Sequence, residues 1–286
     1  MIGQPLSLRF EGCDFDADRI TQSSGSQAEH SLDYHQGSIV PTPPWYAVNE
    51  DQLSRIFSLH QDSDPGRMVR VTTFPTSLLQ EFHSLFGPEV PLQREEVARV
   101  AGGHGGQKVY AQVASALAQG MFVRGKCELA AEPRGGFCVK SANLLTVTIN
   151  GRSGLRVGLH VDDLSGLDIG QRASAPSRMC ANFGWTDRFF LLVNVSVDDL
   201  GCLTAGRLLR RHAGAENKTK NLGRSRPLKD LVDSFLYAHP NRPVVRIRIR
   251  PGEAYIAPTE NLVHDGSTVG SAIPDVACHV RGMFQT

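Results

Sequence analysis

The chain has 286 residues, of which 41% are hydrophobic and 21% charged, and its formal net charge is +1. This composition is typical of a soluble globular protein with a sizeable core, and the near-zero charge gives no general attraction to nucleic acid or to an anionic membrane. The longest apolar runs fall short of the roughly 18 residues of a membrane span, and the first residues lack a signal-peptide pattern.

The cysteines indicate the compartment. Six of them are scattered along the chain without a C-x-x-C pair, at positions 13, 127, 138, 180, 202 and 278. In a chain of this length, that pattern favours free thiols in a reducing environment over a disulfide framework or a cysteine-ligated zinc site. We therefore expect a cytoplasmic protein.

Residues 1–140 are predicted to form a helical cover that belongs to the same domain as the rest of the chain. The first 45 residues are polar and interrupted by Gly, Ser and Pro, and "TQSSGSQAEHS" (21–31) predicts an exposed loop. Apolar residues at helical spacing then predict four helices. They are expected over 49–61, 75–87, 91–103 and 106–123.

Residues 141–286 are predicted to form a β-rich core, because short runs with period-two character replace the helical patterns. The runs cover 143–150, 155–163, 188–197, 243–250, 253–258 and 276–284. Helices followed by strands favour a mainly β fold with some α, a sandwich or open barrel covered by the N-terminal helices.

An insert at about 200–242 separates two of these strands. It is basic from Arg207 to Lys229 and then predicts a helix in "PLKDLVDSFLYAH" (227–239). The basic part has few aromatic residues, which a nucleic-acid surface would need for stacking. We interpret it as a solvated loop or as a lid over a pocket.

The stretch "RVGLHVDDLSG" (156–166) carries the first candidate site residues. In a strand, His160 and Asp162 lie on one face, about 6.6 Å apart along the chain, so both can reach one cation. Asp163 points the other way or begins the turn. The alternative is an ordinary half-buried strand with these polar residues in solvent.

Two later segments add to this pattern. His264 follows a Pro251-Gly252 turn and a short strand, which is how a jelly roll can deliver a third ligand from another strand. In "CHVRGMF" (278–284), His279 and Arg281 lie opposite an apolar face. If the helices cover that apolar face, the polar faces of both strands line one internal cavity.

The ordered combination of His160-x-Asp162, His264 after a Pro-Gly turn, and Arg281 on the next strand resembles the iron(II)/2-oxoglutarate-dependent oxygenase superfamily. The resemblance covers residues 143–286. It implies a double-stranded β-helix (jelly-roll) core, Fe(II) bound by His160, Asp162 and His264, and Arg281 holding the distal carboxylate of 2-oxoglutarate. It also suggests Asn182 as a second contact to 2-oxoglutarate, although a turn residue before Gly184 is an equally good interpretation of Asn182.

General chemistry fits this resemblance. Two imidazoles and one carboxylate suit Fe(II) and leave coordination positions open, and a planar guanidinium suits a carboxylate. The resemblance implies oxidation of a C–H bond by O2, through hydroxylation or desaturation, in a small metabolite such as an amino acid or a natural-product intermediate. Halogenation is not expected, because halogenating relatives have a small residue where Asp162 stands.

Two other functions remain open at this point. A zinc-dependent hydrolase could use the same three ligands with water in the fourth position. A jelly roll that only binds a ligand would show no turnover. No nucleic-acid or membrane partner is expected for any of the three.

Overall fold

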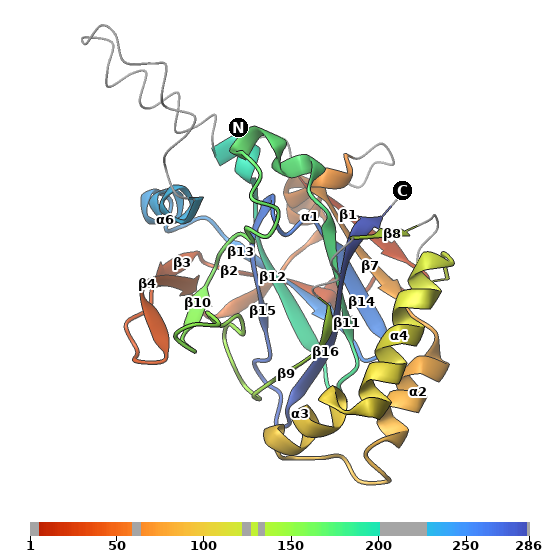
Figure 1. Ribbon diagram of the computed structural model, residues 1–286. Helices are drawn as coiled ribbons and strands as arrows, with labels where there is room; N and C mark the ends of the chain where they lie inside the picture. Colours follow the sequence, from red (N-terminus) through yellow and green to blue (C-terminus); the bar gives the residue numbers. More distant parts are fainter. Residues whose placement is uncertain (1–5, 59–63, 122–126, 131–134, 201–227, 285–286) are drawn as a thin grey trace, which may run out of the picture.

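The computed structural model describes residues 6–58, 64–121, 127–130, 135–200 and 228–284. Over these residues the chain is a mixed α/β protein with extensive antiparallel sheets (Figure 1). Most of the predicted basic insert, with Cys202, lies outside the described residues. The five cysteines within them are all free thiols.

The larger sheet has eight strands drawn from both halves of the chain. Its order is β6–β1–β7–β14–β11–β16–β8, and β9 also pairs with β16. Apart from β1, which runs parallel to β6 and β7, the pairs are antiparallel. The strands are β1 (Leu6–Glu11), β6 (Phe57–Ser58), β7 (Met68–Thr73), β8 (Cys127–Leu129), β9 (Gly136–Lys140), β11 (Ser177–Asn182), β14 (Glu253–Ala257) and β16 (Asp275–Phe284).

Two smaller sheets complete the β-structure. A five-stranded antiparallel sheet has the order β15–β12–β13–β2–β5, and a three-stranded sheet has the order β10–β4–β3. A bridge between His160 and His264 joins the end of β10 to β15. The strands are β2 (Ile20–Ser23), β3 (Ser26–Ala28), β4 (Tyr34–Pro41), β5 (Trp45–Ala47), β10 (Arg156–Gly158), β12 (Arg188–Ser196), β13 (Val244–Ile249) and β15 (Leu262–Ser267).

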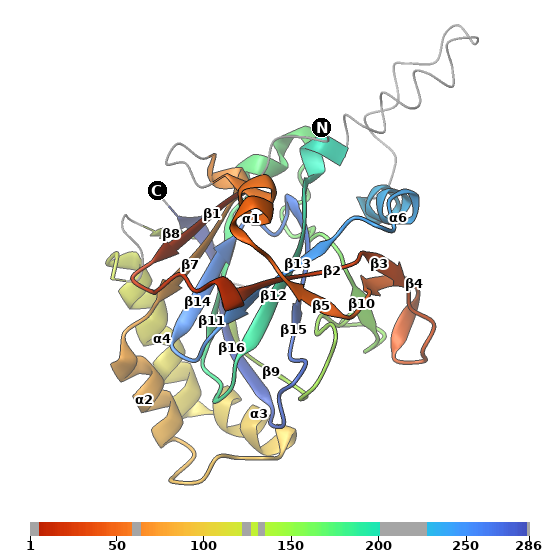
Figure 2. The same ribbon diagram turned by 180° about the vertical axis from the view of Figure 1, so that it is seen from behind.

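The helices lie on the outside of the sheets. Figures 1 and 2 show α2, α3 and α4 together on one flank and α6 on the opposite side. None of the helices in the described part of the chain combines the length and apolar character needed to cross a membrane. The helices are α1 (Glu50–Ile56), α2 (Thr76–Ser84), α3 (Arg94–Gly102), α4 (His104–Ala118) and α6 (Leu228–Ala238).

Strand alternation sorts the apolar side chains into separate cores. Met179 and Val280, on the outer face of the larger sheet, pack with Phe82 and other residues of α2–α4. Between the sheets, Tyr255 of β14 stacks on Phe190 of β12, with ring centroids 4.1 Å apart. On the face of the five-stranded sheet that points away from the larger sheet, residues of α6 pack on side chains of β12 and β13. The polar faces of β11 and β16 therefore point inward.

The helices predicted over 75–87, 91–103 and 106–123 are confirmed as α2–α4, and the one predicted over 49–61 is confirmed in its first part as α1, but the rest of the chain before residue 75 differs from the predicted helical cover. Strands β1 to β7 lie between Leu6 and Thr73 and contribute to all three sheets, and "TQSSGSQAEHS" contributes to β2 and β3 instead of an exposed loop. Ile20 pairs with Ile247, far along the chain. Such strands are short and polar, and their stability comes from distant partners that a local pattern does not reveal.

In the C-terminal half, five of the six predicted runs contain a strand. The exception is 143–150, where Ile149 makes only an isolated bridge to Arg156. The helix predicted after the insert is confirmed as α6. From Cys127 onward, four strands lie outside the predicted runs: β8, β9, β11 and β15.

Candidate metal centre

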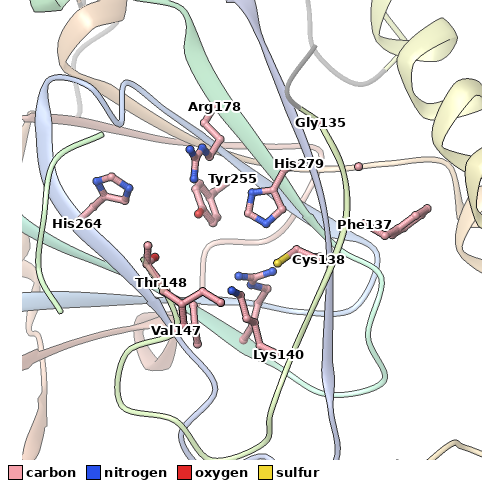
Figure 3. Close-up of a pocket in the computed structure, with 15 residues that line it drawn as sticks. Gly135, Phe137, Cys138, Lys140, Val147, Thr148, Arg178, Tyr255, His264 and His279 are labelled. Carbon is pink, nitrogen blue, oxygen red and sulfur yellow. The ribbon is translucent and has the colours of Figure 1, made fainter. Parts of the chain in front are cut away.

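A cavity of about 310 Å³ lies between the two large sheets, lined by side chains from β9, β11, β12, β14, β15 and β16. Figure 3 shows Arg178, Tyr255 and His279 converging on it from one side and His264 from the other, whereas Phe137 points away toward the helices. The strands β15 and β16 each bring a histidine, His264 and His279, to this internal space, whereas His160, Asp162 and Arg281 are not part of its lining.

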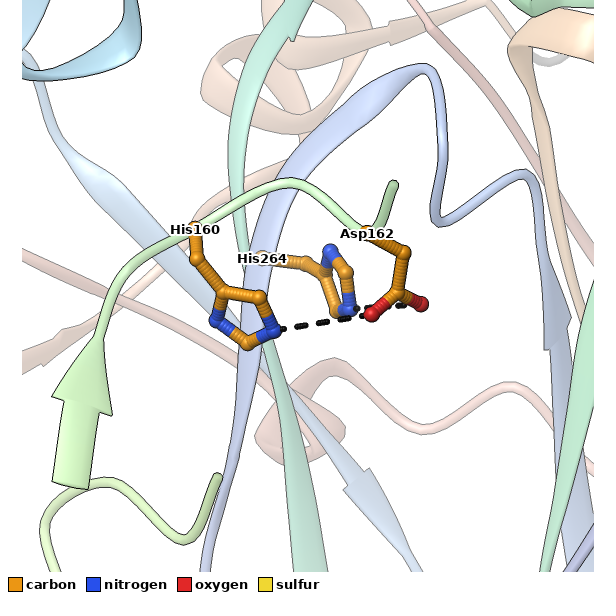
Figure 4. Close-up of side chains that lie close together, drawn as sticks. All are labelled: His160, Asp162 and His264. Atoms are coloured by element: carbon orange, nitrogen blue, oxygen red, sulfur yellow. Dashed lines mark ion pairs between the residues drawn. The ribbon is translucent and has the colours of Figure 1, made fainter. Parts of the chain in front are cut away.

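His160, Asp162 and His264 lie together beside this cavity, where each offers one ligand atom within 4.8 Å of the others. The Nε2 atom of His160 is 3.7 Å from Asp162 Oδ1, and the Nε2 atom of His264 is 3.8 Å from Asp162 Oδ2 (Figure 4). Ligand atoms about 2.1 Å from one ion and at right angles to each other lie about 3 Å apart. Small side-chain rotations would therefore close this group around an ion.

Backbone pairing sets the positions of the two histidines. His160 N–H donates to the His264 carbonyl at 3.0 Å, and His264 N–H donates to the His160 carbonyl at 2.8 Å. Directly opposed residues of an antiparallel pair present their side chains on one face, and the two rings are 4.7 Å apart. Asp162, two residues beyond His160, is held by its N–H donating to the Thr259 carbonyl at 3.0 Å.

Each ring uses its Nδ1 atom in a hydrogen bond, which leaves its Nε2 atom to bind a metal. His160 Nδ1 lies 2.8 Å from the Gly158 carbonyl, and His264 Nδ1 lies 3.1 Å from the Leu262 carbonyl. Because a carbonyl only accepts, each Nδ1 carries the proton and each Nε2 presents a lone pair. His160 Nε2 is buried and has no hydrogen-bond partner among the described residues. A metal ion would satisfy it, so the residues fit a bound cation.

Electrostatics favour the protonation states that a metal needs at Asp162 and His264. Burial opposes the charge of Asp162, but the nearby His160 imidazole, His264 and the Arg178 guanidinium outweigh it and hold the pKa of Asp162 well below its usual range. Burial lowers the pKa of His264 to about 3. For His160, burial is outweighed by Asp162 and Asp265, which raise its pKa. A metal ion would displace the proton from that ring.

Arg178 is a site residue that the sequence did not predict. Its Nη2 lies 2.8 Å from Asp162 Oδ2, and its side chain lines the cavity. It alternates along β11 with Met179, which packs under the helices. That period-two signal is present in "SRMCAN", but the strand is short and ends in polar residues, so it was missed.

Arg188 is a second unpredicted cation of the cavity. It is only 2% exposed, and its Nε and Nη1 atoms have no hydrogen-bond partner among the described residues. Its Nη1 faces Asp275 Oδ2 at 3.5 Å, and Lys140 lines the same space. A buried guanidinium with unsatisfied N–H groups is costly unless an anion completes its hydrogen bonds. The cavity therefore suits an anionic ligand.

The side chains of the two predicted cofactor contacts, Arg281 and Asn182, both have partners within the protein. Arg281 reaches the inner face of β16 as expected, but its guanidinium forms an ion pair with the buried Glu260. Asn182 donates from Nδ2 to the carbonyls of Thr186 and Ile249, and its Oδ1 accepts from Gly184 N–H. These bonds match the turn interpretation of Asn182. A carboxylate ligand would have to displace Glu260 to reach Arg281.

His279 provides a test of the positive field in the cavity. Burial and the charges of Arg178, Arg188 and Lys140 keep its pKa well below the ordinary 6.5, despite the opposing charge of Asp162. The folded protein thus keeps His279 neutral, while the unfolded chain takes up a proton below pH 6.5. The contribution of His279 to the free energy of unfolding is therefore fully present above pH 6.5. It is lost as the pH falls, by at most about 1.4 kcal/mol per pH unit.

We expect His279→Gln to flatten the fall in unfolding free energy between pH 6.5 and pH 5, measured by urea denaturation of the metal-free protein. His264 contributes a similar slope to both proteins, so the difference between them isolates His279. Parallel curves would contradict the prediction.

Comparisons with known proteins do not indicate a function for this chain. No model of a known protein family matches the chain, and no curated protein matches it. Function therefore has to be inferred from side-chain chemistry and geometry.

Proposed function

We propose that the protein is an iron(II)- and 2-oxoglutarate-dependent oxygenase that uses O2 to oxidise a C–H bond of a small molecule. The observation that carries the proposal is the convergence of His160, Asp162 and His264, with both Nε2 atoms directed at the carboxylate, beside a cavity that contains a buried and incompletely hydrogen-bonded arginine. The two parts match the two requirements of this chemistry, a metal ion and a dicarboxylate.

The strand pairing supports a double-stranded β-helix as the core. In the larger sheet the strands lie side by side in the order β9–β16–β11–β14, so strands from the two ends of this region alternate. In the five-stranded sheet the order is β15–β12–β13, and the His160 segment lies next to β15. From β9 to β16 the chain crosses between the two facing sheets at each step except from β12 to β13, which are neighbours in the five-stranded sheet, and this path supports the jelly-roll proposal. His264 comes from β15, at the edge of the five-stranded sheet, and His160 and Asp162 come from the segment that follows β10.

His160, Asp162 and His264 would hold the iron, which when bound supplies the activation of O2 that the side chains of a protein lack. Each side chain has its own part in preparing the site. The Gly158 and Leu262 carbonyls fix the two imidazole tautomers, and Arg178 orients the Asp162 carboxylate. The same arginine adds positive charge on the cavity side of the ligands.

The cavity is the proposed site for 2-oxoglutarate. Its volume of about 310 Å³ is at the lower end of the range for small-molecule sites, roughly 300–1,000 Å³. We assign the distal carboxylate to Arg188, with Lys140 nearby, because both line the cavity, Arg281 does not, and the contact of Arg188 with Asp275 leaves its Nε and Nη1 atoms without hydrogen-bond partners among the described residues. A guanidinium holds a carboxylate through two parallel hydrogen bonds, which also fixes its orientation.

The test is anaerobic addition of Fe(II) and then 2-oxoglutarate to the metal-free protein. We expect a weak visible charge-transfer band that needs both additions, and succinate formation when air and a suitable small molecule are admitted. Binding of Zn(II) with hydrolysis and without an Fe(II)–2-oxoglutarate band would favour a hydrolase. Absence of both the band and succinate would overturn the oxygenase proposal.

A further inference from the structure

Glu260 connects the two segments that carry the metal ligands. It lies four residues before His264 in the sequence and is completely buried. Its carboxylate accepts from Ser165 N–H at 2.9 Å and from the Ser165 hydroxyl at 2.8 Å. Ser165 lies three residues after Asp162. One carboxylate thus joins the chain beyond Asp162 to the chain before His264.

Arg281, in β16, completes this connection. Its Nη2 is ion-paired with Glu260 Oε1 and also donates to the Ser165 hydroxyl at 3.1 Å. Arg281 is 7% exposed, so its partner is a buried charge that offsets its own. A buried pair of this kind is costly to break from one side, because the remaining charge is left without compensation.

Arg172 adds a second connection between the same segments. It lies in a short 3-10 helix, η3 (Ile169–Ser174), and is 3% exposed. Its Nη1 donates to the carbonyls of Asp162 at 3.1 Å and of Glu260 at 3.4 Å, and its Nη2 reaches Asp163 Oδ1 at 2.6 Å. The backbone on either side of the Asp162 side chain is therefore tied down by buried groups.

We propose that Glu260, Arg281, Ser165 and Arg172 form a positioning clamp that sets the Asp162 carboxylate at the correct distance from His264. The inference rests on the proposed metal site but not on the identity of the co-substrate. Asp162 lies beyond the end of β10, so sheet pairing alone does not place it. Arg281 and Glu260 are thus positioning residues, and neither of them lines the cavity.

The test measures the affinity of the full-length metal-free protein for Co(II) alone, by chelator competition and by the visible Co(II) spectrum. Replacing residues that hold metal ligands typically weakens metal binding about 10–100-fold. We expect a loss of that size and a changed spectrum for the charge-free pair Glu260→Leu/Arg281→Met. Ser165→Ala keeps the ion pair, so it is the milder variant, and its expected loss is about threefold to tenfold.

A matched control removes another buried ion pair. Arg19→Met/Glu253→Leu deletes a pair that is 1% and 6% exposed and whose other partners, Asp14, Arg248 and Arg250, belong neither to the clamp nor to the metal ligands. We expect this variant to lower thermal stability as much as the clamp variant does, while Co(II) affinity and spectrum stay those of the wild type.

The outcomes separate the clamp from the alternatives. Unchanged Co(II) affinity and spectrum in both clamp variants would overturn the proposal. So would a clamp variant that keeps its Co(II) affinity but loses 2-oxoglutarate, because Arg281 would then be the carboxylate anchor. If the wild type binds Co(II) but not 2-oxoglutarate, the oxygenase proposal fails and the clamp test still stands.

Discussion

Asp162→Ala is expected to weaken Fe(II) binding by more than about 100-fold, since even the residues behind metal ligands contribute 10–100-fold. The variant removes the only carboxylate of the three-residue group and leaves His160 and His264 without the charge that faces both rings. Succinate formation should fall to background. Chelator competition measures the first effect, and a coupled succinate assay measures the second.

Two further variants serve as a control and as a test that could contradict the assignment of Asp162. Asp187→Ala removes a carboxylate that is 41% exposed and paired with Arg248, so we expect metal affinity and turnover to stay within about twofold of the wild type. Asp162→Gly removes the carboxylate and opens the most space at the metal. Full native activity in Asp162→Gly would show that this residue is not a ligand.

Loss of Arg188 is expected to have the second large effect, on 2-oxoglutarate instead of on iron. Each hydrogen bond to a charged group contributes about 1.5–3 kcal/mol, so two lost contacts predict at least a 100-fold weaker 2-oxoglutarate affinity. Since Arg188→Met alone would leave Asp275 buried and unpaired, the informative variant is Arg188→Met/Asp275→Asn. Titration of the anaerobic charge-transfer band gives the affinity.

Asp275→Asn by itself is the control for this pair. It keeps the guanidinium and removes a competing acid at 3.5 Å, so 2-oxoglutarate should bind at least as well as in the wild type. Fe(II) affinity should change little in either variant, because Arg188 contacts none of the three proposed ligands. A double variant with native 2-oxoglutarate affinity would remove Arg188 from the proposed site.

The proposed ligands illustrate how much of the site a local pattern predicts. The i, i+2 spacing of His160 and Asp162 and the histidine after the Pro251-Gly252 turn made these residues candidates, the family resemblance combined them into one site, and the structure brings the three together. The face assignment of 278–284 also agrees, because side-chain direction alternates along any strand whatever its partners. These features depend on neighbouring residues only.

The partners of the charged residues required coordinates. The sequence showed that Arg281 points inward but not that Glu260, twenty-one residues earlier, would occupy its guanidinium. Arg178 and Arg188 were missed as site residues because β11 was not predicted and because Arg188 reads as the polar edge of an apolar run. Which cation faces a cavity depends on how two sheets pack, and this is a property of distant segments.

By itself, the sequence determined the class of elements in the C-terminal half, the helices that cover the larger sheet, and the three candidate ligands, because periodicity and spacing act over a few residues. Only the tertiary structure decided that residues before 75 form strands, that the cavity carries Arg188, and that Arg281 is paired. Those outcomes depend on hydrogen bonds and ion pairs between residues far apart in the chain, whose partners become neighbours only on folding.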